Sequence, residues 1–348
     1  MTKWRLMYTN IRGMKGKKNS LIEILHDNDP HIFLLTETQL RSNVGMHIEG
    51  YKFYGRKREG KIGGGVGILV RNDIVDKTTP HISNRNAEIM WISIHRNQSR
   101  PLFIGVYYGQ QESRTSKNEI EMEMCLLKEE INEMQNEGEI LIIMDANAKI
   151  GLLGEEKTRN GRLILDVFQQ TGLIILNNTE KCDGKITRKN TRNEHEISAI
   201  DFVVVNQEAG KMVTKMMIDE NGIYKVRGKN ETDHNTICVD IVIDSLNKTK
   251  VVRKTDWNLR ASGEKWAQFG VQLEQRQIAA ERIITNKNFP FEERYNKWFN
   301  QIDTAARKTI GKTTFKTGGK EKFSNDVKAL QREKKEIRQL MRNNKNIS

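Results

Sequence analysis

The sequence predicts an α/β protein in which helices pack in layers on β-sheets, followed by a basic, helical C-terminal extension. Three observations predict this arrangement: many short apolar segments within the first 245 residues, a few helical segments between them, and a change of charge near residue 250. With 348 residues, of which 36% are hydrophobic, the chain is large enough to form a packed core.

The predicted strands are rich in Val, Ile and aromatic residues, and their lengths fit strands better than helices. Two of the segments, LFIGVYY and IDFVVV, are apolar on both faces, as is typical of strands in the middle of a covered sheet. In chain order, the expected strands are Trp4–Thr9, Ile32–Thr36, Gly65–Arg71, Ile89–His95, Leu102–Tyr108, Ile140–Asp145, Leu173–Asn177, Ala199–Val205 and Thr236–Ile243.

Helices are expected both among these strands and beyond them. The three among the strands are Asn19–His26, Lys117–Gln135 and Gly161–Thr171. The last of these ends at Gly172, a favourable C-terminal cap. The three beyond residue 250 are Leu259–Ile284, Glu292–Ile310 and Asn325–Met341, in which apolar residues recur at helical spacing. The Gly-, Lys- and Thr-rich segment KTIGKTTFKTGGKEK is predicted to be loose.

The positive charge is concentrated in the last part of the chain. Residues 251–348 contain 22 Lys and Arg against 11 Asp and Glu, whereas residues 1–250 contain 36 against 34. This distribution favours a polyanion as the partner of the extension. A Lys-rich surface that is merely solvated is the alternative.

Three widely spaced cysteines, Cys125, Cys182 and Cys238, form no CxxC pair, which favours a reducing compartment. The N-terminus lacks the apolar core of a signal peptide, and no apolar run approaches the roughly 20 residues that span a bilayer. We therefore expect an intracellular protein that is neither secreted nor anchored by a transmembrane segment.

Six of the predicted strands carry polar residues at or near an end. These residues are Asn10, Glu37, Tyr107 with Tyr108, Asp145 with Asn147, Asp201, and Asp233 with His234. Each has an ordinary explanation alone, because Asp and Asn often start turns and a core histidine can bond to a backbone carbonyl. Together they predict one polar site at an edge of the sheets. Asp201, which stands in an apolar strand, needs a partner there, and a histidine would serve.

Acidic residues supported by amides form a site for a hard cation such as Mg²⁺, with Mn²⁺ as a substitute. A zinc site is disfavoured because cysteines are few and the seven histidines are scattered. A Mg²⁺ ion beside an Asp and a His can hydrolyse a phosphate ester, because the metal polarises the phosphoryl group while the side chains move protons.

Five motifs in this order resemble those of the endonuclease/exonuclease/phosphatase superfamily: YTNIRGM, LLTET, MDANAKIG, SAIDFVVV and TDHNTI. The segment from NAKIG to LIILNN is similar to the endonuclease domain of non-LTR retrotransposons. The resemblance covers about residues 4–245. It implies a four-layer sandwich of two mixed β-sheets flanked by helices at 1–248. Residues 249–348 would then be a basic helical linker toward a reverse transcriptase that the sequence lacks.

The resemblance also implies roles for the residues at the strand ends. Glu37 would ligate the metal, with Asn10 and Asp233 close to it. Asp145 would position and activate the attacking water, and Asn147 would hold the scissile phosphate.

On the other side of the phosphate, the resemblance implies that His234 donates to a phosphate oxygen while Asp201 fixes its tautomer. Tyr107 would contact the phosphate or leaving group, with Tyr108 as the alternative. The residues expected to contact nucleic acid are Arg12, Tyr108 and Lys149.

The sequence departs from the family pattern at several positions. Met144 stands where a glycine is usual, Ala146 separates the central Asp and Asn, and Thr232 replaces a serine. Arg12 replaces an acid or amide of the abasic-site enzymes, which argues against abasic-site specificity. The tyrosines are followed by GQQ instead of Pro-Asn, so the choice between them stays open.

The function that these features imply is Mg²⁺-dependent nicking of double-stranded DNA, as in the initiation of target-primed reverse transcription. The extension would contact DNA or the element RNA, and the protein would act in the nucleus when it cuts genomic DNA. Two alternatives stay open: a phosphoesterase acting on inositol phosphates or sphingomyelin, and a decayed DNA-binding copy without catalysis.

Overall fold

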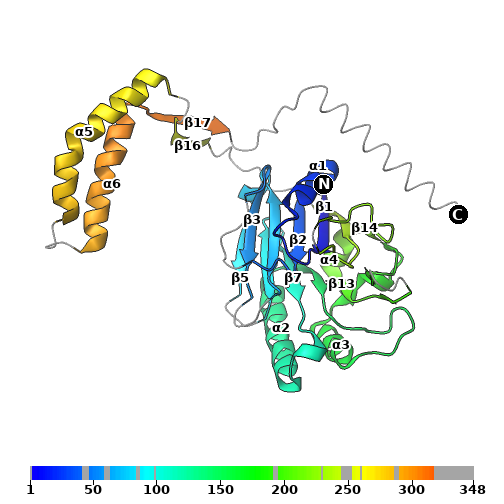
Figure 1. The fold of residues 1–348 in the computed structure, drawn as a ribbon. Helices are drawn as coiled ribbons and strands as arrows, with labels where there is room; N and C mark the ends of the chain where they lie inside the picture. The colour runs from blue at the N-terminus through cyan, green and yellow to red at the C-terminus, as the bar shows by residue number, and fades with distance from the viewer. Residues whose placement is uncertain are drawn as a thin grey trace. The chain divides into compact units, whose positions relative to one another are not determined.

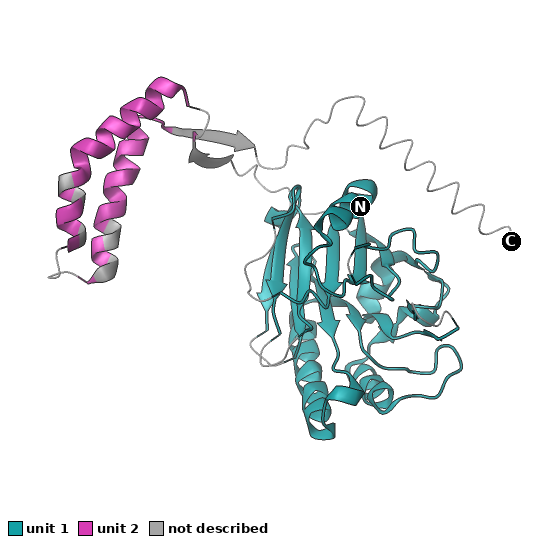
Figure 2. Cartoon of the chain, in the orientation of Figure 1, with its two compact units in different colours: residues 1–249, 320–348 teal, residues 250–319 magenta. Residues whose placement is uncertain are grey.

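The computed structural model describes residues 2–316 apart from 41–46, 59–62, 84–86, 98, 191–194, 229, 244–252, 259–260 and 286–289. The chain divides into two compact units, with the boundary between Thr249 and Lys250 (Figure 2). The first unit contains both large sheets, and the second contains two helices and a small sheet.

Seven strands form the first large sheet, in the order β10-β14-β15-β1-β2-β4-β3. Figure 1 labels β1, β2, β3 and β14 of this sheet. At its centre, β1 runs parallel to β2 and antiparallel to β15. The strands are β1 (Thr2–Asn10), β2 (Ile32–Thr36), β3 (Tyr51–Arg56), β4 (Val66–Arg71), β10 (Cys182–Asp183), β14 (Val213–Ile218) and β15 (Ile237–Ile243).

Six strands form the second large sheet, in the order β5-β6-β7-β8-β13-β9. Here β7 and β8 are parallel and β13 is antiparallel to β8, so this sheet is mixed as well. The strands are β5 (Thr78–Ile82), β6 (Ile89–Ile94), β7 (Leu102–Tyr108), β8 (Glu139–Asp145), β13 (Asp201–Val205) and β9 (Ile174–Ile175). A separate pair joins β11 (Arg188–Lys189) to β12 (Ile197–Ser198).

The buried apolar side chains form three clusters that define four layers. The largest lies between the two sheets, where Trp4, Leu6 and Tyr8 of β1 belong to the same cluster as residues of the second sheet. A second cluster joins the second sheet to α2 (Lys117–Glu137) and α3 (Arg159–Thr171), and a third joins the first sheet to α1 (Lys18–Asn28). The predicted four-layer α/β sandwich is therefore confirmed.

The helices of the sandwich begin and end where the sequence provides caps. Ser116 and Glu119 form a capping box at the start of α2, and Gly172 ends α3 in the left-handed conformation with φ +67°. Among its described residues, this unit also contains α4 (Gln207–Met212) and three 3-10 turns, Val75–Lys77, Glu112–Arg114 and Leu176–Asn178.

Several strands near the sheet edges are not predicted from the sequence. β3 and β5 are edge strands, and β5 contains Pro80, which weakens any strand signal. β14 lies next to the two-residue edge strand β10. The segment predicted as the strand Leu173–Asn177 forms only the two residues of β9 before a 3-10 turn begins.

The second unit contains α5 (Gly263–Thr285) and α6 (Phe291–Lys308), joined by a hydrogen bond from Arg276 to Gln301. The antiparallel pair β16 (Arg253–Trp257) and β17 (Lys312–Lys316) accompanies them. The prediction of a loose segment after α6 is therefore wrong for the residues of β17, which pair with β16. The predicted helix at 325–341 lies outside the described residues.

None of the helices within the described residues has the length and apolar character required to cross a lipid bilayer.

The start of α3 packs against the loop that follows β8. A Cβ atom at Gly161 would lie 1.9 Å from the main-chain oxygen of Lys149, so only glycine fits there. We expect Gly161→Ala to lower the free energy of unfolding by about 1–3 kcal/mol, because the added methyl forces the two backbones apart. Urea-induced unfolding would measure the change.

Gly270→Ala in α5 is the matched control, because a Cβ there meets nothing within 4 Å and alanine favours a helix over glycine by about 1 kcal/mol. Equal stability of Gly161→Ala and the parent protein would contradict the close contact.

Candidate active site

The register of the strands brings the predicted site residues to one end of the sandwich. Parallel neighbours end together: Asn10 is level with Thr36 in the first sheet, and Tyr108 is level with Asp145 in the second. The antiparallel strand β13 begins at this end, with Asp201 paired to Asp145. Residues spread over much of the chain therefore meet at one edge.

An amide and two carboxylates form the first half of the site. The Nδ2 group of Asn10 donates to Oδ2 of Asp145 at 2.8 Å and to Oε1 of Glu37 at 2.9 Å. Its Oδ1 atom accepts the main-chain N–H of Arg12 at 3.0 Å. Asn10 therefore lies beside Glu37, as expected from the sequence. Its amide N–H groups, and not its oxygen, face the two carboxylates, so Asn10 holds Glu37 and Asp145 together.

A buried ion pair forms the second half of the site. The Nδ1 atom of His234 lies 2.9 and 3.0 Å from the two carboxylate oxygens of Asp201, so Nδ1 carries a proton that it donates to them. The hydroxyl of Tyr8 donates to Oδ1 of Asp201 at 2.8 Å. The Nε2 atom of His234 is 3.8 Å from Oδ2 of Asp145, which links the two halves.

Burial shapes the protonation of this cluster. Asp145 and Asp201 are 0% exposed and His234 is 5% exposed. Burial, reinforced by the charges of Asp201 and Glu37, raises the pKa of Asp145 to about 7 against the opposing effects of His234 and Asn10. Burial alone would lower the pKa of His234, but the carboxylates of Asp201 and Asp145 outweigh it and raise that pKa to about 9.

The two adjacent tyrosines of β7 point to opposite faces of the sheet. Tyr107 belongs to the apolar cluster under α2 and α3, and its hydroxyl donates to Glu123 of α2 at 3.0 Å. Tyr108 belongs to the cluster between the sheets, and its hydroxyl donates to Oε1 of Glu37 at 3.0 Å. The expectation that Tyr107 lies in the site is therefore corrected, because side chains alternate along a strand and Tyr108 is the one that faces Glu37.

Three residues of the site have backbone conformations that side chains other than glycine rarely adopt. Arg12, Glu37 and Asn147 have φ values of 46°, 50° and 47°. At Asn147 this turn lets the main-chain N–H donate to Oδ1 of Asp145 at 3.0 Å, while Nδ2 donates to the carbonyl of Gly109 at 2.9 Å. Such strained positions cluster at functional sites.

Lys149 lies further along the same loop and is half-buried. Its main-chain N–H donates to the hydroxyl of Thr158, the N-cap of α3, at 3.1 Å. Its backbone therefore connects the loop after β8 to α3.

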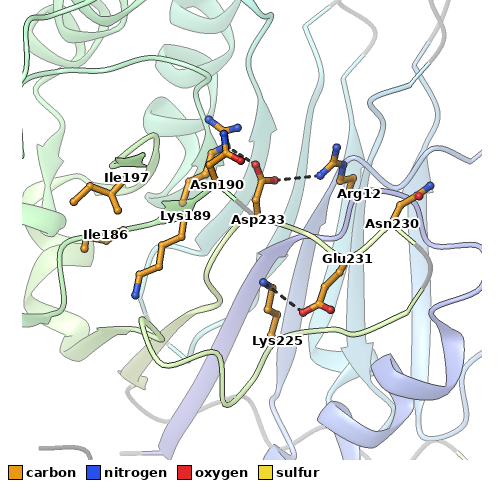
Figure 3. Close-up of a pocket in the computed structure, with 10 residues that line it drawn as sticks. Arg12, Ile186, Lys189, Asn190, Ile197, Lys225, Asn230, Glu231 and Asp233 are labelled. Carbon is orange, nitrogen blue, oxygen red and sulfur yellow. Dashed lines mark hydrogen bonds and ion pairs between the residues drawn. The ribbon is translucent and has the colours of Figure 1, made fainter. Parts of the chain in front are cut away.

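Asp233 lies in an ion-paired cluster beside the site. Its Oδ2 atom is 2.7 Å from Nε of Arg188. Its Oδ1 atom is 3.7 Å from Nη1 of Arg12 (Figure 3). The pKa of Asp233 is lowered, because His234 and Arg188 together outweigh the effect of burial. Asp233, which was expected near the metal, has both of its oxygens within ion-pair distance of arginines.

These arginines and Asp233 line a cavity of about 1060 Å³. Asp233 directly precedes His234 in the sequence. The charged residues that line the cavity are Arg12, Arg188, Lys189, Lys225, Glu231 and Asp233. Lys225 is 3.4 Å from Glu231, so both acids are paired and the bases exceed them by two (Figure 3). The cavity therefore favours an anion.

The donor set of the site suits a divalent cation. One ligand atom each from Asp145, Asp201 and His234 lie within 4.8 Å of one another. Asp201 and His234 bond to each other, whereas Glu37 and Asp145 both accept from the amide of Asn10, which brings two carboxylates together. Carboxylate oxygens are the ligands that hard cations prefer.

The sequence pattern did not reveal Tyr8 and Arg188 as parts of the site. Tyr8 has a usable signal, because it stands two residues before Asn10 in β1 and therefore on the same face of the strand. Arg188 has none, because it reaches Asp233 through the short pair of β11 and β12.

Comparison with known families shows that residues 7–209 match the model of the Endonuclease/Exonuclease/phosphatase family. No curated protein sequence matches the chain.

Solved structures share the fold at low sequence identity. The endonuclease domain of TRAS1, a telomere-specific non-LTR retrotransposon, is 18% identical, with a TM-score of 0.53 over 70% of this chain and 100% of that domain. The AP endonuclease LMAP from Leishmania major is 12% identical, with a TM-score of 0.57 over 69% and 87% of the two chains. The 3′ phosphatase NExo from Neisseria, bound to a product DNA hairpin, is 14% identical, with a TM-score of 0.54 over 69% and 99%.

The ion pair between Asp201 and His234 makes stability depend on pH. The folded-state pKa of His234 lies above its ordinary value of 6.5, so the stabilisation is complete below pH 6.5 and is lost as pH rises through about 9. Without added metal, we expect Asp201→Asn to destabilise the protein more at pH 6 than at pH 9.5, and to lower the pKa of His234 by about 1–3 pH units.

Urea unfolding at the two pH values and an NMR titration of the His234 ring would measure these changes. His31, whose pKa is lowered mainly by burial, is an internal control in the same spectra. A pKa of His234 that is unchanged by Asp201→Asn would contradict this account.

Proposed function

Because the chain belongs to the Endonuclease/Exonuclease/phosphatase family, we propose that it is a divalent-metal-dependent phosphodiesterase that nicks double-stranded DNA. The observation that carries the proposal is the convergence of Glu37, Asp145 and the Asp201–His234 pair at one end of the sandwich. A carboxylate pair and a charged imidazole that lie at the same end of the sandwich can face a single phosphodiester.

The proposed metal ligands are the carboxylates of Glu37 and Asp145, both held by Asn10. A bound Mg²⁺ or Mn²⁺ ion would supply a Lewis acid that polarises a phosphoryl oxygen. In this proposal, Asn10 positions the two acids, and Asp233 serves the neighbouring anion site instead of the metal.

The remaining roles concern protons. Asp145 is the proposed base for the attacking water, because its carboxylate lies between Asn10 and the imidazole of His234. His234, held charged by Asp201, would donate from Nε2 to a phosphate oxygen as negative charge develops there. Asn147 would hold the scissile phosphate, and Tyr108 takes the role first expected of Tyr107.

In the proposed reaction, water attacks the phosphorus and the bond to the 3′ oxygen breaks. The products are a 5′-phosphate and a 3′-hydroxyl, which takes up a proton. A free 3′-hydroxyl can prime DNA synthesis, as the initiation of target-primed reverse transcription requires.

DNA is proposed as the substrate because the anion cavity lies beside the site, with Arg12, Arg188 and Lys189 in its lining. Phosphate contacts by such residues supply most of the affinity of proteins for DNA. The fold is shared with the retrotransposon endonuclease domain of TRAS1, which supports a retroelement role. We assign residues 1–248 to the endonuclease domain and residues 249–348 to a basic linker that contacts DNA or RNA.

We expect Asp145→Asn and His234→Ala each to slow the nicking of supercoiled plasmid by about 10²- to 10⁴-fold, because each removes a proton-transfer or charge-stabilising group. EDTA should abolish nicking by the parent protein, and excess Mg²⁺ should restore it. DNA polymerase should extend the nicks without prior phosphatase treatment, which reports the 3′-hydroxyl.

Asp166→Asn is the matched control, because Asp166 lies on the exposed face of α3 and should leave the rate unchanged. Nicking by either site variant at the parent rate would overturn the assignment. Turnover of soluble phosphate esters without binding to duplex DNA would favour a phosphatase instead.

A second experiment addresses the extension. Residues 251–348 carry twice as many basic as acidic residues, so their removal should weaken DNA binding and reduce the slope of log K against log salt. Binding of a labelled duplex to residues 1–248 and to the full chain, between about 50 and 200 mM salt, would measure both quantities. Identical slopes would contradict phosphate contacts by the extension.

A further inference from the structure

Lys17 is a lysine that the proposed chemistry does not use, yet it is almost completely buried, with 1% of its surface exposed. Its Nζ group donates to three main-chain carbonyls: Ile11 at 2.5 Å, Arg12 at 3.1 Å and Asn230 at 2.7 Å. An ammonium has three N–H donors, so each of them has a partner. Burying this charge would be unfavourable without these bonds.

The three carbonyls belong to two loops that carry opposite halves of the site. Ile11 and Arg12 directly follow Asn10, the residue that holds Glu37 and Asp145. Asn230 stands four residues before His234, in the loop that leads to it. The Lys17 ammonium therefore connects the carboxylate half of the site to the imidazole half.

The surrounding contacts are arranged for this connection. A Cβ atom at Gly228 would lie 3.0 Å from Cγ of Lys17 and 3.1 Å from the carbonyl of Gly16, so the second loop passes closely over the lysine. The N–H of Arg227 donates to the hydroxyl of Ser20 at 2.8 Å. The first loop is fixed on its other side, because the N–H of Gly13 donates to the carbonyl of Glu37 at 2.8 Å.

A second link between the loops is weaker than the lysine. The ion pair of Arg12 with Asp233 has a separation of 3.7 Å, and the side chain of Arg12 is 48% exposed. An ion pair that is exposed to water contributes little, because solvent screens it. Hydrogen bonds from a buried charged donor contribute more. The two loops also share a buried apolar cluster that contains Ile11, Met14 and Val226, and Lys17 is the stronger of the two polar links between them.

We propose that Lys17 is a positioning residue that sets the separation between the Asn10–Glu37–Asp145 group and His234. The role rests on the proposed nuclease function, because the two groups must contact one phosphodiester together. It also has a structural consequence that can be measured without any activity. A displacement of about 1 Å between catalytic groups can lower a rate by about 10²-fold.

The test compares Lys17→Ala, with and without n-propylammonium, to the parent protein. Propylammonium replaces the three carbons and the nitrogen that the substitution removes, so it can restore the bonds to the three carbonyls. Lys17→Met fills the volume without the charge, and Lys18→Met, at the start of α1, is the control for loss of one positive charge. Plasmid nicking rates, DNA affinity and hydrogen exchange are measured for each protein.

The expected result is a fall of about 10²-fold in the nicking rate of Lys17→Ala at saturating DNA, with little change in affinity. Amide exchange should increase in both loops, residues 11–14 and 226–235, and propylammonium should reverse the exchange and the rate together. Lys18→Met should match the parent protein in all three measurements.

Two outcomes would overturn the proposal: unchanged exchange in the 226–235 loop of Lys17→Ala, or recovery of exchange without recovery of the rate. If Lys17→Met unfolds, the rescue of Lys17→Ala still decides the question. If the parent protein does not nick DNA, the proposed function fails; exchange that stays unchanged in the variant would refute the connection separately.

Discussion

The structure depends on the compensation of negative charge buried at one end of a β-sandwich. Asp145 and Asp201 are fully buried, and the half-buried Glu37 shares a hydrogen-bond donor with Asp145, so three carboxylates meet at this end. Isolated buried carboxylates are strongly unfavourable. Here Asn10 and Tyr8 donate to them, and His234 contributes a positive charge. The positions of these donors are therefore fixed by electrostatics as well as by packing.

The sandwich supplies the rigidity that such a site requires. The residues Arg12, Glu37 and Asn147 have left-handed backbone conformations, which cost about 1–3 kcal/mol each for residues other than glycine. Each of these residues lies one or two positions beyond a strand whose last five residues are buried, and the strand ends hold these conformations in place. The left-handed conformation of Asn147 turns its main-chain N–H toward Asp145, where a regular turn would not place it.

The sequence reveals those parts of the site that follow from strand register, and misses those that depend on tertiary neighbours. Asn10, Asp145 and Asp201 stand at strand ends, and the pairing within each sheet brings such ends level: parallel for Asn10 with Thr36 and for Tyr108 with Asp145, antiparallel for Asp201 with Asp145. The two tyrosines of β7 could not be distinguished, because β7 is apolar on both faces and alternation does not tell which face meets the other sheet. The same reasoning located the central strands but not the edge strands β3 and β5.

Asp233 shows why a residue type at a motif position does not determine its role. A carboxylate next to His234 suggests a metal ligand, but Arg188 comes from a distant hairpin and Arg12 from the loop after β1 to pair with it. The pairing converts what would be a fourth acid into part of a cavity with excess positive charge.

The consequence is a site with two adjacent regions of opposite charge: an acidic cluster that a cation would complete, and a basic cavity that an anion would complete. A metal-bound phosphodiester has this distribution of charge, and its chain of phosphates would extend from the first region into the second. Arg12, the residue that departs from the pattern of the abasic-site enzymes, contributes positive charge to the second region. Its main-chain N–H bonds to Asn10, so this charge lies beside the acidic cluster.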